Sequence, residues 1–88
     1  MTVRLSVDRR RWVSHVDATL AAYPSPVPVV KGNGYGFGRD RLARLAAERV
    51  DTIAVGTVHE LDAVPSNITA VVLTPTLVAP DRHDVVLT

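Results

Sequence analysis

Residues 27–38 read Val-Pro-Val-Val-Lys-Gly-Asn-Gly-Tyr-Gly-Phe-Gly, a short apolar run that ends at Lys31 and gives way to alternating glycines. The nearly continuous β-branched residues over 27–31 are typical of a strand covered on both faces. The glycines permit positive φ angles and let a ligand approach the backbone closely. We therefore predict a buried strand with a lysine at its carboxyl end, followed by a loop suited to close contacts.

A helix is predicted upstream, over residues 7–23, because apolar residues recur there at steps of three and four. Its apolar stripe consists of Trp12, Val13, Val16, Leu20 and Tyr23. Ser6 is placed to act as its N-cap. Three prolines within residues 24–28 end the helix, since proline removes a backbone donor and restricts the residue before it.

Downstream, we predict a helix over 39–50, a strand over 52–57, a short helix over 59–64 and a strand over 69–74. Helices that alternate with strands give parallel strands joined by crossovers, either in an open doubly wound sheet or in a (β/α)8 barrel. Ligands bind at the carboxyl ends of the strands in both architectures. Lys31 lies at such an end.

Composition excludes several classes of function. The chain has 88 residues, 47% of them hydrophobic, and a formal net charge of +1, so neither a nucleic acid nor a membrane is an expected partner. We interpret Arg9–Arg11, the one basic run, as a solvated helix face. The absence of cysteine excludes disulfides and thiolate metal sites. No signal peptide or membrane-spanning run is present, so we expect a cytoplasmic protein.

No metal site is predicted either, because the three histidines, His15, His59 and His83, are too widely spaced for a local metal motif. We expect them to be ordinary surface or helix-flanking residues.

The glycine-rich stretch does not match the common nucleotide loops. The pattern G-x-G-x-x-G requires a glycine where Phe37 or Arg39 stands, and the phosphate loop G-x-x-x-x-G-K is also absent. A lysine desolvated at the mouth of a parallel sheet can react with a carbonyl cofactor through its free amine. A lysine whose stem follows the strand end while its head reaches water fits the same residues. The residues alone leave both interpretations of Lys31 open.

Residues 29–38 closely resemble the cofactor-lysine motif of alanine racemases, V-V-K-A-N-A-Y-G-H-G. Residues 5–23 resemble the opening strand and helix of that family. Residues 53–62 and 71–74 resemble its second and third barrel strands. The resemblance implies an α/β fold in which residues 1–88 form about three βα units of a pyridoxal 5′-phosphate (PLP) binding (β/α)8 barrel, without the rest of the barrel and the C-terminal β domain.

The resemblance also implies a function: PLP-dependent interconversion of L-alanine and D-alanine, which supplies D-alanine for cell-wall peptidoglycan. By position in the motif, Lys31 is the Schiff-base lysine and one of two catalytic bases, and Tyr35 lies against the cofactor. Leu73 matches a pocket-lining leucine. The family is homodimeric, and the partner subunit supplies a tyrosine as the second base. Groups that hold the cofactor's phosphate and pyridine nitrogen come from later barrel strands.

Three positions depart from the motif: Gly32 and Gly34 replace alanines, and Phe37 replaces a histidine. We expect the glycines to loosen the turn and Phe37 to remove a polar contact. The alternatives are a non-catalytic fragment or remnant of the family, or a related PLP-dependent racemase or decarboxylase of the same fold. A non-catalytic PLP carrier is disfavoured by the sequence at 34–36. The 88-residue chain by itself is expected to be inactive, because it offers one base where two are needed.

Overall fold

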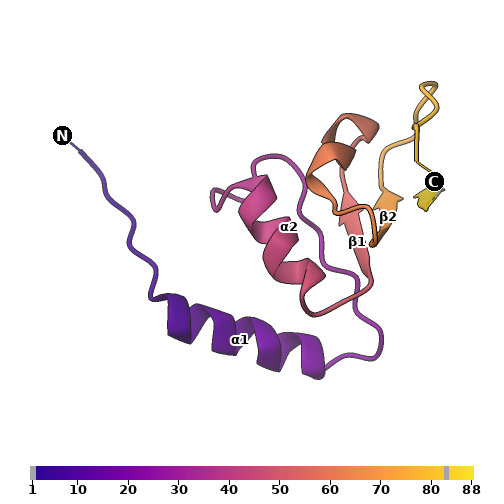
Figure 1. The fold of residues 1–88 in the computed structure, drawn as a ribbon. Helices are drawn as coiled ribbons and strands as arrows, with labels where there is room; N and C mark the ends of the chain where they lie inside the picture. Colours follow the sequence, from indigo (N-terminus) through magenta and orange to yellow (C-terminus); the bar gives the residue numbers. More distant parts are fainter. Residues whose placement is uncertain (1, 83) are drawn as a thin grey trace.

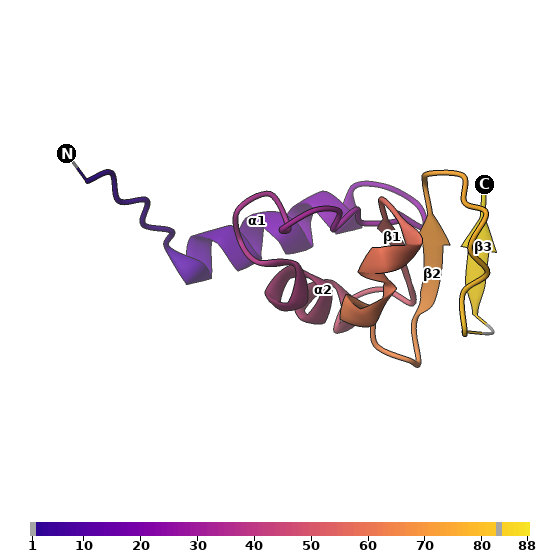
Figure 2. The same cartoon turned by 90° about the horizontal axis from the view of Figure 1, so that it is seen from above.

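The computed structural model describes residues 2–82 and 84–88. Its elements are α1 (Arg9–Ala21), α2 (Arg39–Ala47), β1 (Thr52–Val55), the 3-10 helix η1 (Val58–Ala63), β2 (Thr69–Val72) and β3 (Val85–Leu87). The helices lie to one side of the strands, and the segment before α1 extends away from the body of the molecule (Figures 1 and 2).

The three strands form one parallel sheet in the order β1-β2-β3. Val55 pairs with Val72, and Val72 pairs with Leu87. This confirms the parallel α/β arrangement that the sequence predicts. The strand β3 was not predicted, and the connection that precedes it contains no helix among the described residues, so the third βα unit is incomplete.

The strand predicted over 27–31 is reduced to a single parallel bridge between Val29 and Ala54. Two hydrogen bonds hold it, Val30 N–H to Ala54 O at 2.9 Å and Ala54 N–H to Pro28 O at 2.8 Å. Proline has no N–H to donate, so the prolines that end the preceding helix also shorten this strand. The segment nevertheless continues the sheet beyond β1 and places Lys31 at the carboxyl edge.

The first helix is shorter than the periodicity predicts. Asp8, not Ser6, is its N-cap, and its carboxylate accepts from Arg11 N–H at 3.1 Å. Tyr23 lies past the helix end and is 64% exposed, so it does not belong to the apolar stripe. No α1 residue is fully buried. An ion pair between Asp17 and Arg49 ties α1 to the chain that follows α2.

The remaining boundaries differ by a few residues. The helix predicted to 50 ends at Ala47, because the chain must turn there to enter β1. The strands predicted to 57 and 74 end at Val55 and Val72, and the short helix predicted over 59–64 is η1.

The core lies between α2, η1 and one face of the sheet. Its fully buried large side chains are Val30, Ile53, Val55 and Val72. Ala43 and Ala46 from α2 and Leu61 from η1 complete the cluster. Residues alternate between the two faces of a strand, so Val55 and Val72, the last residues of β1 and β2, point into this core.

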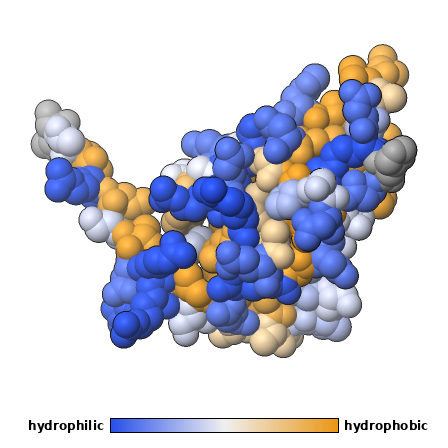
Figure 3. Space-filling model, in the orientation of Figure 1, coloured by the Kyte–Doolittle hydropathy of each residue, from blue (hydrophilic) through white to orange (hydrophobic). Residues whose placement is uncertain are grey.

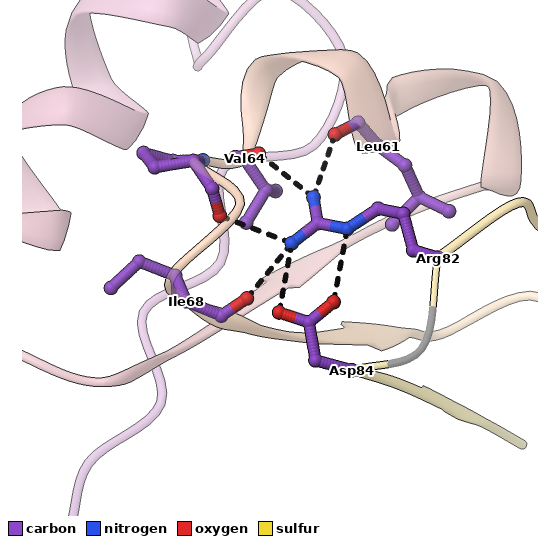
Figure 4. A network of polar contacts seen from close by, with 6 residues as sticks. Leu61, Val64, Ile68, Arg82 and Asp84 are labelled. Carbon is purple, nitrogen blue, oxygen red and sulfur yellow. Dashed lines mark hydrogen bonds and ion pairs between the residues drawn. The ribbon is translucent and has the colours of Figure 1, made fainter.

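Arg82 holds the amino ends of β2 and β3 together (Figure 4). Its guanidinium donates to four backbone carbonyls, at 2.8–3.2 Å, from Leu61, Val64, Pro65 and Ile68. It also binds both carboxylate oxygens of Asp84, at 3.2 and 3.1 Å. This network fixes the edge opposite to Lys31.

Apolar surface remains exposed at both ends of the chain (Figure 3). Val3 and Leu5 are 88% and 85% exposed in the extended segment before α1, and Leu77 is fully exposed between β2 and β3. On β3, about half of the surface of Val86 and Leu87 is exposed. Unpaired strand edges with exposed apolar residues promote association, so we expect the isolated chain to have limited solubility.

Candidate functional site

Lys31, Gly56 and Leu73 lie side by side at the carboxyl edge of the sheet. The pairing of Val29 with Ala54 places Lys31 beside Gly56, and the pairing of Val55 with Val72 places Gly56 beside Leu73. Each of the three follows a buried valine, so the alternation of a strand turns it away from the helix-covered core. The sequence predicted this placement of Lys31.

The amine of Lys31 is accessible and unpaired. Lys31 is exposed, and within the described part of the chain it forms no hydrogen bond or ion pair. Of the two interpretations that the sequence left open, the exposed Lys31 matches the one in which its head reaches water, because no described element covers this face of the strand end. Gly56 leaves space beside the lysine: a Cβ there would lie 3.2 Å from Lys31 Cβ. Lys31 is also the single lysine of the sequence.

The loop after Lys31 is closed by its own backbone. Phe37 N–H donates to Gly34 O at 3.0 Å, and Gly38 N–H donates to Asn33 O at 2.8 Å. Gly34 has a φ of 71°, and a Cβ there would lie 2.8 Å from Gly38 O. An alanine, the residue of the racemase motif, does not fit this loop without a backbone shift. The folded loop thus requires glycine at position 34. This requirement adds to the greater freedom that glycine gives the unfolded chain.

Tyr35 and Phe37 lie in this loop with different surroundings. Tyr35 is 60% exposed, adopts a φ of 57°, and forms no hydrogen bond within the described residues. Phe37 stacks on Trp12 of α1, with ring centroids 4.8 Å apart and an interplanar angle of 20°. The aromatic ring at 37 therefore joins the loop to the first helix. No ring contact or ion pair of Tyr35 occurs among the described residues.

Glu60 was missed by the sequence reasoning. Its Oε2 accepts from Gly32 N–H at 2.8 Å, and its Oε1 accepts from the N–H groups of Gly56 at 2.7 Å and Thr57 at 3.2 Å. Burial by itself raises the pKa of the carboxyl, but these three N–H groups and the charge of Arg39 outweigh it, so the pKa lies below its ordinary 4.5. The spacing Thr57-x-x-Glu60, that of a capping box, was the available signal.

The two histidines among the described residues form no metal site with the residues at the sheet edge. His15 and His59 are exposed on α1 and η1. His83 lies outside the residues that the structure describes. Within residues 2–82 and 84–88, no group of three or more His, Cys, Asp or Glu residues could hold a metal ion. No helix in this part of the chain has the length and apolar character needed to cross a membrane.

These features define a parallel α/β protein with a free lysine at the carboxyl edge of its sheet, followed by a glycine-rich loop. Comparison with protein families matches residues 9–87 to the alanine racemase N-terminal domain, and the chain belongs to that family. Comparisons with curated proteins and with solved structures give no match.

The family is PLP-dependent, and the residues at the sheet edge fit that cofactor in two respects. The Lys31 amine is unpaired and can bond to an aldehyde, and the space that a Cβ would fill at Gly56 lies beside its stem. Tyr35 adds an exposed ring and hydroxyl from the adjoining loop. The cofactor would therefore be held covalently by Lys31 and contacted by Tyr35.

Proposed function

We propose that this chain provides the cofactor lysine of a PLP-dependent alanine racemase, the enzyme that interconverts L-alanine and D-alanine. The observation that carries the proposal is the unpaired amine of Lys31 at the carboxyl edge of a parallel sheet, where α/β proteins bind their ligands. Family membership supports the same chemistry. The proposal includes a homodimer in which the partner subunit supplies the second catalytic base.

Lys31 performs two tasks in this proposal. Its Nζ would hold the cofactor through the aldehyde group. The same Nζ would carry a proton to or from the alanine α-carbon on one face. PLP, when bound, supplies a conjugated ring that withdraws electrons from the α-carbon and eases its deprotonation.

The assignment of Lys31 is tested with PLP and borohydride. We expect a visible absorbance band on addition of PLP and, after reduction, a stable label on the peptide that contains Lys31. In chains acetylated at the N-terminus, where the α-amine cannot react, Lys31→Arg keeps the positive charge but cannot form the bond, so it should lose both signals. A band and label that persist in Lys31→Arg would contradict the assignment.

Tyr35 is proposed to contact the cofactor through its ring or hydroxyl. Tyr35→Ala should weaken PLP binding by about 1 to 3 kcal/mol, the scale of a lost aromatic contact or hydrogen bond. Tyr35→Phe separates the two contributions, since it removes the hydroxyl alone. Unchanged PLP affinity in Tyr35→Ala would show that the tyrosine packs only within its loop.

Residues 1–88 alone are not expected to racemise alanine. Lys31 is a single base, and racemisation needs one on each face of the α-carbon. Conversion of L-alanine to D-alanine by the chain with added PLP should equal that of PLP alone. Turnover above this control that disappears in Lys31→Arg would contradict the expectation.

A further inference from the structure

Gly32, the residue that follows Lys31, is held on both sides by charged side chains. Gly32 N–H donates to Glu60 Oε2 at 2.8 Å, and Gly32 O accepts from Arg39 Nη1 at 2.8 Å. Hydrogen bonds to ionised groups are roughly twice as strong as those between neutral groups. Glycine at a φ of 66° has little conformational preference of its own. The orientation of the two peptide units that meet at Gly32 therefore depends on Glu60 and Arg39.

Glu60 also holds the peptide unit between Lys31 and Gly32 against the neighbouring strand. While Oε2 binds Gly32 N–H, Oε1 binds the N–H groups of Gly56 and Thr57, which follow β1. One carboxylate thus joins the ends of two adjacent strands, directly beside Lys31. The lowered pKa of Glu60 means that the carboxylate is charged at neutral pH.

Arg39 binds the next peptide unit, through Gly32 O, from another element. It is the first residue of α2, and it lies 3.7 Å from Asp62 Oδ1 on η1. Asp62 is 78% exposed and so restrains Arg39 weakly. The contact with Gly32 O is the closest that the guanidinium makes among the described residues.

We propose that Glu60 and Arg39 are positioning residues for Lys31. They fix the two peptide units that meet at Gly32, so the amine leaves the strand end in one direction and holds the bound cofactor in one orientation. Neither residue needs to touch the cofactor. The inference rests on the proposed function, because it takes Lys31 to be the cofactor lysine.

Visible circular dichroism of PLP bound to the chain tests the inference. A cofactor held in a fixed asymmetric setting gives a dichroic band, whereas a freely rotating one does not. The signal is divided by the amount of borohydride-trapped label on Lys31, so it reports orientation and not occupancy. Far-UV circular dichroism of the same samples reports folding.

The main variant is Glu60→Gln, which keeps the size of the side chain. Its amide nitrogen cannot accept a hydrogen bond, so one of the two strand ends loses its acceptor. Glu48→Gln is the matched control, because the Glu48 side chain is 71% exposed and its carboxylate pairs, among the described residues, with Arg49 alone, at 3.3 Å. We expect the visible signal per label to fall at least about threefold in Glu60→Gln, as a charge-assisted contact is lost, and to stay unchanged in Glu48→Gln.

The possible results separate the two proposals. Absence of label on Lys31 in the unsubstituted chain refutes the proposed function, and the positioning role with it. Label on Lys31 with no visible signal above that of the urea-unfolded chain overturns only the positioning role. Visible circular dichroism per trapped label that is unchanged in Glu60→Gln also overturns the positioning role. If Glu60→Gln loses the far-UV spectrum, Arg39→Gln decides: a reduced signal supports the proposal, and an unchanged one overturns it.

Discussion

Replacement of Arg82 by alanine should remove much of the stability of this chain. The guanidinium satisfies four backbone carbonyls between Leu61 and Ile68 and pairs with both oxygens of Asp84. Removal takes six hydrogen bonds away from the amino ends of the strands, although Leu61 O and Pro65 O keep the N–H groups of Val64 and Ile68 as donors. Breaking a buried ion pair costs about 3 to 5 kcal/mol.

The lower end of that range applies here. The side chains of Arg82 and Asp84 are 19% and 32% exposed, so water replaces part of what is lost. We therefore expect Arg82→Ala to lower the free energy of unfolding by about 3 kcal/mol, against about 5 to 15 kcal/mol for a typical domain. Arg82→Lys should lose about half as much, because an ammonium keeps the charge but cannot present a planar fork of donors.

Urea unfolding followed by far-UV circular dichroism measures these differences. Arg44→Ala is the control, since Arg44 is exposed on α2 and has no partner in the described structure. It should change the free energy of unfolding by no more than about 0.5 kcal/mol. If Arg82→Ala is as stable as this control, the network does not hold the strand ends as described.

Three further predictions concern the loop and Glu60. Gly34→Ala should lower the free energy of unfolding by about 1 to 3 kcal/mol in thermal melts, because it imposes a positive φ on alanine and a Cβ contact with Gly38 O; an unchanged melting temperature would contradict the loop geometry. Phe37→Ala should cost about 1 to 2 kcal/mol and shift the fluorescence of Trp12, the single tryptophan, to longer wavelength; an unmoved emission maximum would exclude the stacking. Because the pKa of Glu60 is lowered in the folded chain, its stabilising contribution is complete above the ordinary value of 4.5 and is lost as the pH falls through the folded-state pKa. The urea concentration at the unfolding midpoint should therefore fall less between pH 6 and acidic pH in Glu60→Gln than in the unsubstituted chain. An equal fall in the two chains would contradict the stabilising role of the Glu60 carboxylate.

The parallel sheet and the place of Lys31 could be predicted, because both follow from local pattern. An apolar β-branched run favours a buried strand, and the first residue that breaks the run marks the end of the segment. Lys31 is that residue in the first segment. The strand over 52–55 was recognised for the same reason.

The features that escaped prediction depend on distant parts of the chain or on competing local effects. The prolines at 24, 26 and 28 remove donors that a full strand needs, so the first segment keeps only a bridge at Val29. β3 has three residues, too few for a recognisable period. The contact of Glu60 with Gly32 spans 28 residues, and only the packed fold brings the two together.

The central claim, that Lys31 is the cofactor lysine, is tested most directly by the affinity of PLP for Lys31 in the folded and unfolded chain. After acetylation of the N-terminus, Lys31 is the only primary amine left. The visible band, titrated with PLP in buffer and in concentrated urea, then reports this one site. We predict binding at least about tenfold tighter in the folded chain, equal to about 1.4 kcal/mol from contacts with the strand end and the glycine-rich loop. Equal affinity in the two states would mean that the fold adds nothing to an ordinary lysine, and would contradict the account.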